Sequence, residues 1–150
     1  RFGYPTIFIQ QEAIVQPIGD LLQSLAQGGA LEIAVRPGFQ VGIRVCIPPY
    51  PLGGRVSFPG YARGAPIVFR DGDLAGVHFE DAKLVDREWQ VAGVDGAPLT
   101  VVGMGATMAE ASEQALNRVR RVHISEMYYR ADIGGRWETD RQVLQAWGWL

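Results

Sequence analysis

The segment that decides the fold is residues 100–123, TVVGMGATMAEASEQALNRVRRVH. It starts as an apolar strand, turns through two glycines and continues as a helix. Thr107 and Glu110 have the spacing of a capping box, in which each side chain satisfies a free backbone N–H at the helix start. The helix then repeats apolar residues on one face, at Met108, Ala111, Ala115, Leu116, Val119 and Val122. The segment therefore predicts a strand followed by one amphipathic helix that packs on a core.

The same glycines also resemble the start of a dinucleotide-binding fingerprint. Gly103 and Gly105 stand between a strand and a helix, but Met108 occupies the position of the third glycine. That fingerprint also needs a parallel βαβ unit with phosphate at the helix N-terminus. The strands before residue 103 are expected to pair as hairpins, so a tight strand-to-helix turn is the favoured interpretation.

Upstream of this segment the pattern is that of antiparallel strands. Residues 39–47, FQVGIRVCI, alternate apolar and other residues, which is typical of a half-buried strand with one core face. The pairs Asp71-Gly72 and Asp95-Gly96 separate apolar segments and are typical of hairpin turns. Residues 39–104 are therefore predicted to hold several antiparallel strands without an intervening helix.

Helices are expected at both ends of the chain. Residues 18–26 have amphipathic spacing, with Pro17 in the first turn and Gly28-Gly29 at the end. A shorter helix over 7–15 is a weaker prediction, because TIFI fits a strand equally well. The tail, 138–150, is expected to form a last short helix. This order of elements predicts an α+β fold.

Composition excludes several classes of function. The net charge is −2 and the arginines are scattered, so no basic face for nucleic acid is expected; the basic stretch 117–123 is interpreted as a solvated helix face. No apolar run approaches the ~18 residues that span a bilayer. Cys46 is the only cysteine, which favours a buried residue and a reducing, cytoplasmic location.

Catalytic and metal-binding motifs are not found in the sequence. His78 and His123 are the only histidines, whereas a zinc site needs several ligands at usable spacings. Asp71 and Asp73 fit a turn better than a calcium loop, and no nucleophile elbow or P-loop is present. We therefore predict no catalytic residue and no metal ligand in this chain.

The stretch EMYYRADIGG, residues 126–135, follows directly on the predicted helix. Two tyrosines, Arg130, Asp132 and a glycine pair are concentrated in ten residues. Taken alone, they favour a helix end at which Arg130 pairs with Asp132. The alternative is that they form part of a site.

The wider segment resembles a known family. Residues 100–134 look like the end of phosphoribosylamine–glycine ligase, also called glycinamide ribonucleotide synthetase. In that family a strand, a glycine-bearing turn and a Thr-capped helix run into Tyr-Arg-x-Asp-Ile-Gly, matched here by residues 129–134. RVCIPPYP, residues 44–51, is similar to the strand and Tyr-Pro turn that open the same C-terminal domain. The resemblance covers roughly residues 40–136.

The first residues resemble the end of the ATP-grasp core of that family, which reads Asn-x-Arg-Phe-Gly-Asp-Pro-Glu. Arg1-Phe2-Gly3 and Pro5 match, whereas Tyr4 and Thr6 replace the two acids. The magnesium-holding Glu and Asn of such enzymes would lie before Arg1. The two replacements would change how an amine group is held nearby, so a different substrate or a degenerate relative is possible.

The resemblance implies a three-part organisation. Residues 1–36 would be the end of an ATP-grasp core with connecting helices. Residues 37–136 would form a small antiparallel β-barrel-like domain with one main covering helix, and 137–150 a tail. The parent enzyme would use ATP and magnesium to activate a carboxylate as an acyl phosphate, which an amine attacks to give an amide. This fragment, with no cofactor of its own, would help close the substrate cleft.

The resemblance also implies a few site residues. Arg1 matches an arginine near the substrate pocket, where its fork of donors suits phosphate or carboxylate. Arg130 and Asp132 match the closing motif and would bind substrate or dock the domain. The expected partners are small-molecule substrates and the rest of the ATP-grasp chain, with no nucleic acid and no membrane. The alternative function is a non-catalytic binding or assembly domain, suggested by the tail residues Trp137, Trp147 and Trp149.

Overall fold

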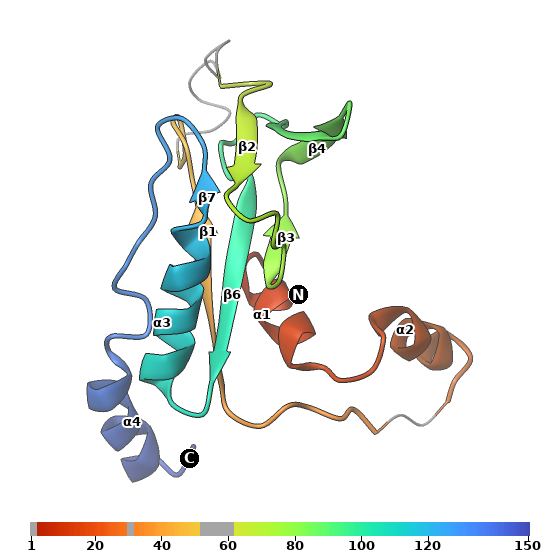
Figure 1. Cartoon of the computed structure of the whole chain (residues 1–150). Coiled ribbons are helices and arrows are strands. Elements are labelled where there is room, and N and C mark those ends of the chain that lie inside the picture. Colours follow the sequence, from red (N-terminus) through yellow and green to blue (C-terminus); the bar gives the residue numbers. More distant parts are fainter. Residues whose placement is uncertain (1–2, 30–31, 52–61) are drawn as a thin grey trace.

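The computed structural model describes residues 3–29, 32–51 and 62–150 of the chain (Figure 1). The helices are α1 (Thr6–Ala13), α2 (Ile18–Ala26), α3 (Met108–Val119) and α4 (Trp137–Ala146). The strands are β1 (Phe39–Val45), β2 (Pro66–Phe69), β3 (Val77–Phe79), β4 (Ala82–Val85), β5 (Glu88–Val91), β6 (Leu99–Gly105) and β7 (Val122–His123). The predicted mixture of helices and antiparallel strands is thus confirmed.

The strands form two sheets. One has the order β1-β6-β3 and the other β4-β5-β2-β7, and the strands of the described ranges pair antiparallel throughout. The long pair β1–β6 runs from Phe39↔Gly105 to Val45↔Leu99. Within the described ranges the strands do not close into a barrel, so the β-barrel-like form implied by the resemblance is not found.

The two predicted Asp-Gly hairpins are wrong. Both glycines have left-handed φ, 66° at Gly72 and 78° at Gly96, so the chain does turn there. Each turn, however, joins strands of different sheets, β2 to β3 and β5 to β6. β6 pairs with β1 and β3 instead, which places its apolar residues in the centre of a sheet. Burial in that central position overrides the local turn signal.

The tight hairpin lies elsewhere, between β4 and β5. Val85 pairs with Glu88, and the two loop residues Asp86 and Arg87 have φ of 49° and 69°. Two consecutive left-handed residues define a type I′ turn, which matches the twist of the flanking strands. Sequence reasoning missed it because neither residue is Gly or Asn.

Helix α3 covers one face of the β1-β6-β3 sheet, as Figure 1 shows. Its capping box forms as predicted, since Glu110 N–H donates to Thr107 Oγ1 and the Glu110 carboxylate accepts from the Thr107 N–H. A Cβ at Gly103 would overlap backbone atoms of Ala111 and Ala115, so glycine allows the helix to lie directly on β6. The strand-to-helix turn is therefore a packing feature.

The helix ends earlier than predicted. Arg120 is its C-cap, and Val122 lies in β7, where β7 pairs with β2. Val122 remains in the core, but as a strand residue. Its apolar character fits both geometries, so the helical spacing alone could not locate the end.

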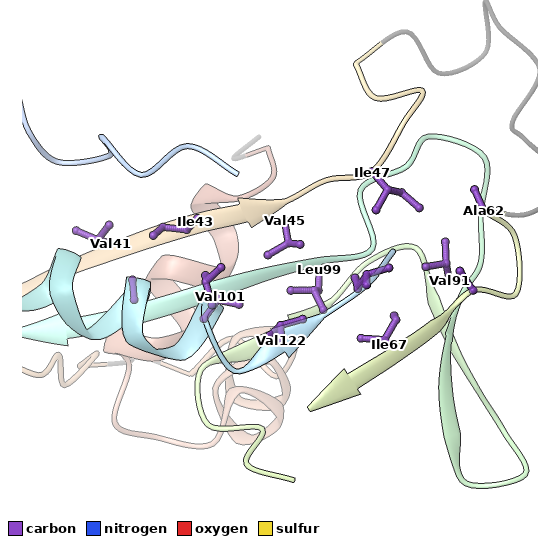
Figure 2. Packing of buried hydrophobic residues seen from close by; sticks show 14 of the residues in the cluster. Val41, Ile43, Val45, Ile47, Ala62, Ile67, Val91, Leu99, Val101 and Val122 are labelled. Carbon is purple, nitrogen blue, oxygen red and sulfur yellow. The ribbon is translucent and has the colours of Figure 1, made fainter. Parts of the chain in front are cut away.

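The hydrophobic core lies between α3 and the two sheets (Figure 2). Its largest fully buried side chains include Ile43, Ile47, Leu99 and Ile124. They come from β1, the loop after it, β6 and the segment after β7, so one core joins both sheets.

Helix α1 lies on the β1-β6-β3 sheet, on the face opposite α3. Phe8 and Ile9 of α1 face the sheet, and a Cβ at Gly42 would overlap the Ile9 side chain. The weaker prediction over 7–15 is thus confirmed as a helix. In Figure 1, α2 stands apart from both sheets, with Leu22 and Leu25 exposed.

Candidate functional site

The closing segment 124–135 is not a helix end, as its residues alone had favoured. It follows β7, turns at residues 125–126, where Glu126 has φ of 59°, and returns to the end of β1. There the Cys46 N–H donates to the Tyr128 carbonyl at 2.9 Å, and the Tyr128 N–H donates back at 2.8 Å. These two hydrogen bonds bring the Tyr-Arg-x-Asp-Ile-Gly motif next to the turn that follows β1.

Arg130 and Asp132 form the pair expected from the sequence. Arg130 Nε donates to Asp132 Oδ1 at 2.9 Å, and Nη2 donates to Oδ2 at 2.6 Å. Hydrogen bonding from the guanidinium lowers the pKa of the Asp132 carboxyl, and the same bonds raise the pKa of Arg130. Both side chains are largely exposed, so the pair is available to solutes.

Two adjoining hollows, of about 260 Å³ and 380 Å³, flank this pair. They lie between the first turn of α3, the closing segment and α4. Both are lined by Met108, Asp132, Ile133, Gly134 and Trp137. Ser112 Oγ donates to the Ile133 carbonyl at 3.1 Å, which holds the closing segment on α3. Arg130 lines the larger of the two hollows.

Arg1, the third residue expected to bind substrate, lies outside the described residues. The structure thus brings Arg130 and Asp132 together at one surface. It does not test a substrate-binding role for any of the three.

A second polar cluster was not anticipated from the sequence. Arg44, Thr100 and His78 lie directly opposite one another across β1, β6 and β3, on the face that carries α1. The alternation in residues 39–47 predicted one core face and left Arg44 on the other. The structure covers both faces, so the polar residues of the second face are enclosed as well.

Glu80 is the centre of this cluster. Its side chain is 6% exposed, and it accepts hydrogen bonds from Arg44 Nη2 and from Thr100 Oγ1, the latter at 2.7 Å. Burial alone would lower the pKa of Arg44, but the charge and hydrogen bond of Glu80 outweigh it and raise that pKa above its ordinary value. The Arg44 guanidinium therefore stays charged.

The cluster extends to the turn after β1. Arg44 Nη1 lies 3.4 Å from Tyr50 Oη, and the guanidinium carbon is 5.2 Å from the centre of the Tyr50 ring. Tyr128 Oη in turn donates to the Tyr50 carbonyl. Arg44 thus links the sheet to the turn, and Tyr128 links the turn to the closing segment.

His78 connects the cluster to α1. Its Nε2 lies 3.0 Å from Glu12 Oε1, and its ring stacks on Phe8 at a centroid distance of 4.8 Å. Tyr4 extends the stack on the other side of Phe8, at 5.2 Å. His123, predicted near a helix C-terminus, lies in β7 and is exposed.

Among the described residues, no three His, Cys, Asp or Glu side chains are grouped so that they could hold a metal ion. The polar clusters are ion pairs and hydrogen-bond networks, and no chemical step is assigned to a metal held here.

The three tail tryptophans differ in their environments. The Trp137 ring packs edge-on against Phe39, with centroids 5.1 Å apart. Trp147 and Trp149 are 67% and 76% exposed. Trp137 therefore holds α4 on the domain, and of the three only Trp147 and Trp149 remain available for a contact.

Two known proteins are similar to this chain. The crystal structure of phosphoribosylamine–glycine ligase from Thermotoga maritima superimposes with a TM-score of 0.63 at 24% identity, over 88% of this chain and 31% of that one. The chain is also 28% identical over 142 residues to phosphoribosylamine–glycine ligase of Leifsonia xyli subsp. xyli, covering 91% of this chain and 33% of that protein.

The resemblance stated from the sequence is thereby confirmed. The chain spans about a third of the length of the proteins it matches, which is consistent with a C-terminal domain of such an enzyme. No family model matches the chain. None of the helices in the described ranges has the length and apolar character that crossing a membrane requires.

Proposed function

We propose that this chain is the C-terminal part of an ATP-dependent carboxylate–amine ligase of the phosphoribosylamine–glycine ligase type, acting in purine biosynthesis in the cytoplasm. The observation that carries the proposal is the match of 91% of the chain to one third of such a ligase. In this proposal residues 1–36 end the ATP-grasp core, 37–136 form the C-terminal domain and 137–150 are a tail.

The domain would contribute one wall of the substrate cleft. Arg130 offers a planar set of donors at the larger hollow, and Asp132 accepts two hydrogen bonds from that guanidinium. Binding a substrate phosphate or carboxylate there would draw on the same donors that now bind Asp132. ATP and magnesium would be held by the remainder of the ligase, and the acyl phosphate and amine would react there.

Tyr4 and Thr6 bear on the identity of the substrate. If the parent is an ordinary glycine-using ligase, both replacements of acidic residues must be tolerated. Tyr4 is 62% exposed and stacks on Phe8, so the acid has been replaced by an aromatic ring that faces solvent. Glycine is therefore one member of the panel of acids to test.

The test is an ATP-hydrolysis assay on the full-length parent, with phosphoribosylamine and a panel of amino acids. We expect turnover that depends on one of the acids and a fall of about tenfold in kcat/KM for Arg130→Gln, as for loss of a charge-assisted hydrogen bond. Arg141→Gln is the matched control, since Arg141 makes an exposed pair with Glu138 and lines neither hollow. Turnover with no acid in the panel would refute the ligase.

In that event the second candidate, a non-catalytic binding or assembly domain, gains weight. The exposure of Trp147 and Trp149 is the observation that favours it. It predicts that the double variant Trp147→Ala/Trp149→Ala abolishes a stable association seen by light scattering. The variant Val143→Ala, on the preceding turn of α4, would be the control.

A further inference from the structure

Helix α1 is attached to the sheet by side chains rather than by backbone pairing. Ile9 packs at Gly42 of β1, and Ala13 at the end of the helix is 5% exposed. Directly after α1, the backbone pairs with residues 34–36. There the Arg36 N–H donates to the Ala13 carbonyl at 2.8 Å. The orientation of α1 on the sheet therefore depends on a few side-chain contacts.

His78 makes two of those contacts. Its ring stacks on Phe8 with an interplanar angle of 17°, and its Nε2 meets Glu12 Oε1 at 3.0 Å. Phe8 and Glu12 are one turn apart on α1, so the imidazole holds the helix at two successive points. The side chain of His78 is 17% exposed, which shields the contact to Glu12 from competing water.

Hydrogen bonds within the sheet support the strand that carries His78. His78 stands opposite Thr100 in the β3–β6 register, and the Thr100 hydroxyl donates to Glu80. Glu80 in turn binds Arg44 of β1. His78 of β3 therefore stands on a sheet in which Glu80 links β6, through Thr100, to β1, through Arg44.

We propose that His78 is a positioning residue that fixes α1, and with it the turn at residues 3–5, on the β-rich domain. The inference rests on the proposed function, in which that turn leads from the ATP-grasp core. His78 would act through α1 and would not touch the reacting atoms. Helix α2, whose Leu22 is 59% exposed, is not held by this contact.

The first test measures amide hydrogen exchange in the chain of 150 residues. We expect His78→Ala to raise the exchange of the α1 amides by roughly tenfold, the factor expected when one charge-assisted hydrogen bond is lost, with α3 unchanged. His78→Phe keeps the ring stack and should give a smaller increase. The same change at the exposed histidine, His123→Phe, is the matched control and should leave α1 protected.

A second variant distinguishes loss of this contact from general unfolding. Glu12→Ala removes the α1 partner without altering the sheet, and should also raise α1 exchange. Combined with His78→Ala, its effect should be less than additive, because both changes break the same contact. Unchanged α1 exchange in both single variants, with α3 still protected, would overturn the proposal.

The link to catalysis is tested in the full-length ligase. His78→Ala should lower kcat roughly tenfold, and His78→Phe by less, while the KM for ATP stays within about twofold, because a displaced turn weakens positioning more than nucleotide binding. His123→Phe should leave both unchanged. Unaltered kcat in a variant with a loosened α1 would refute the catalytic link. An inactive wild-type parent would refute the proposed function, and hydrogen exchange would still decide whether His78 holds α1.

Discussion

The two faces of the β1-β6-β3 sheet are covered in different ways. On the α3 face, apolar side chains and Gly103 meet the helix at backbone distance. On the α1 face, Arg44, Thr100 and His78 form a polar row that is covered as well. One face is held by shape and the other by paired charges and hydrogen bonds. The two faces should therefore fail under different substitutions.

The largest effect is expected on the polar face, at Glu80. Glu80→Ala leaves the Arg44 guanidinium enclosed without its carboxylate, which should lower the free energy of unfolding by about 4 kcal/mol. Urea titration of the variant measures it. Replacing both partners, as Arg44→Met with Glu80→Leu, should recover much of the loss. A loss below about 1 kcal/mol for the single change would show that solvent reaches Arg44 freely.

The shape-dependent face is tested at Gly103. Gly103→Ala places a Cβ against the backbone of Ala111 and Ala115, so α3 must move away from β6. We expect a destabilisation of about 3 kcal/mol, measured by thermal unfolding. Gly19→Ala is the control, because nothing lies within 4 Å of its added Cβ. That helix position should gain about 0.5 kcal/mol. Equal effects at the two glycines would contradict close α3 packing.

The sequence predicted the shape-dependent face better than the polar one. Period-two spacing in 39–47, the capping box at Thr107 and Glu110, and the glycine turn are local patterns. The capping box is confirmed, and residues 39–45 form the predicted strand, although both of its faces are covered and not one. Which strands pair is decided by burial across the whole chain. For that reason the Asp-Gly turns predicted hairpins that the structure does not form.

The contacts of the polar row could not be predicted, because the residues that meet there are far apart in the sequence. Glu12 and His78 meet over 66 residues, and Arg44 and Glu80 over 36. Taken singly, each residue looks like an ordinary exposed position of a strand or helix. The closing pair was foreseen because Arg130 and Asp132 are two residues apart and belong to a motif. Their part in substrate binding stays a prediction.

A third prediction concerns Cys46, the residue directly after the end of β1 at Val45. Burial raises the pKa of its thiol from the ordinary 9.0 to about 11. In that window the unfolded chain releases the proton while the folded chain keeps it, so stability is complete below pH 9 and falls as the pH rises towards 11. Wild type should lose roughly 1 kcal/mol between pH 8 and 10 relative to Cys46→Ala. Parallel urea titrations of the two proteins measure this, and identical pH profiles would show that the thiol is accessible.

The smallest effect is expected at the exposed pair, Arg130 and Asp132, which contrasts with the enclosed pair of Arg44 and Glu80. Because Arg130 lowers the pKa of Asp132, the pair contributes above the ordinary aspartate pKa, and its contribution is lost as the pH falls through the lowered value. Arg130→Gln should return the Asp132 pKa to its ordinary range in an NMR titration, and the unfolding midpoint at neutral pH should scarcely change. Salt should reduce the shift in wild type, because exposed charges are screened. A shift that resists salt would mean that the closing segment is enclosed in solution, and the pair would then resemble the buried one.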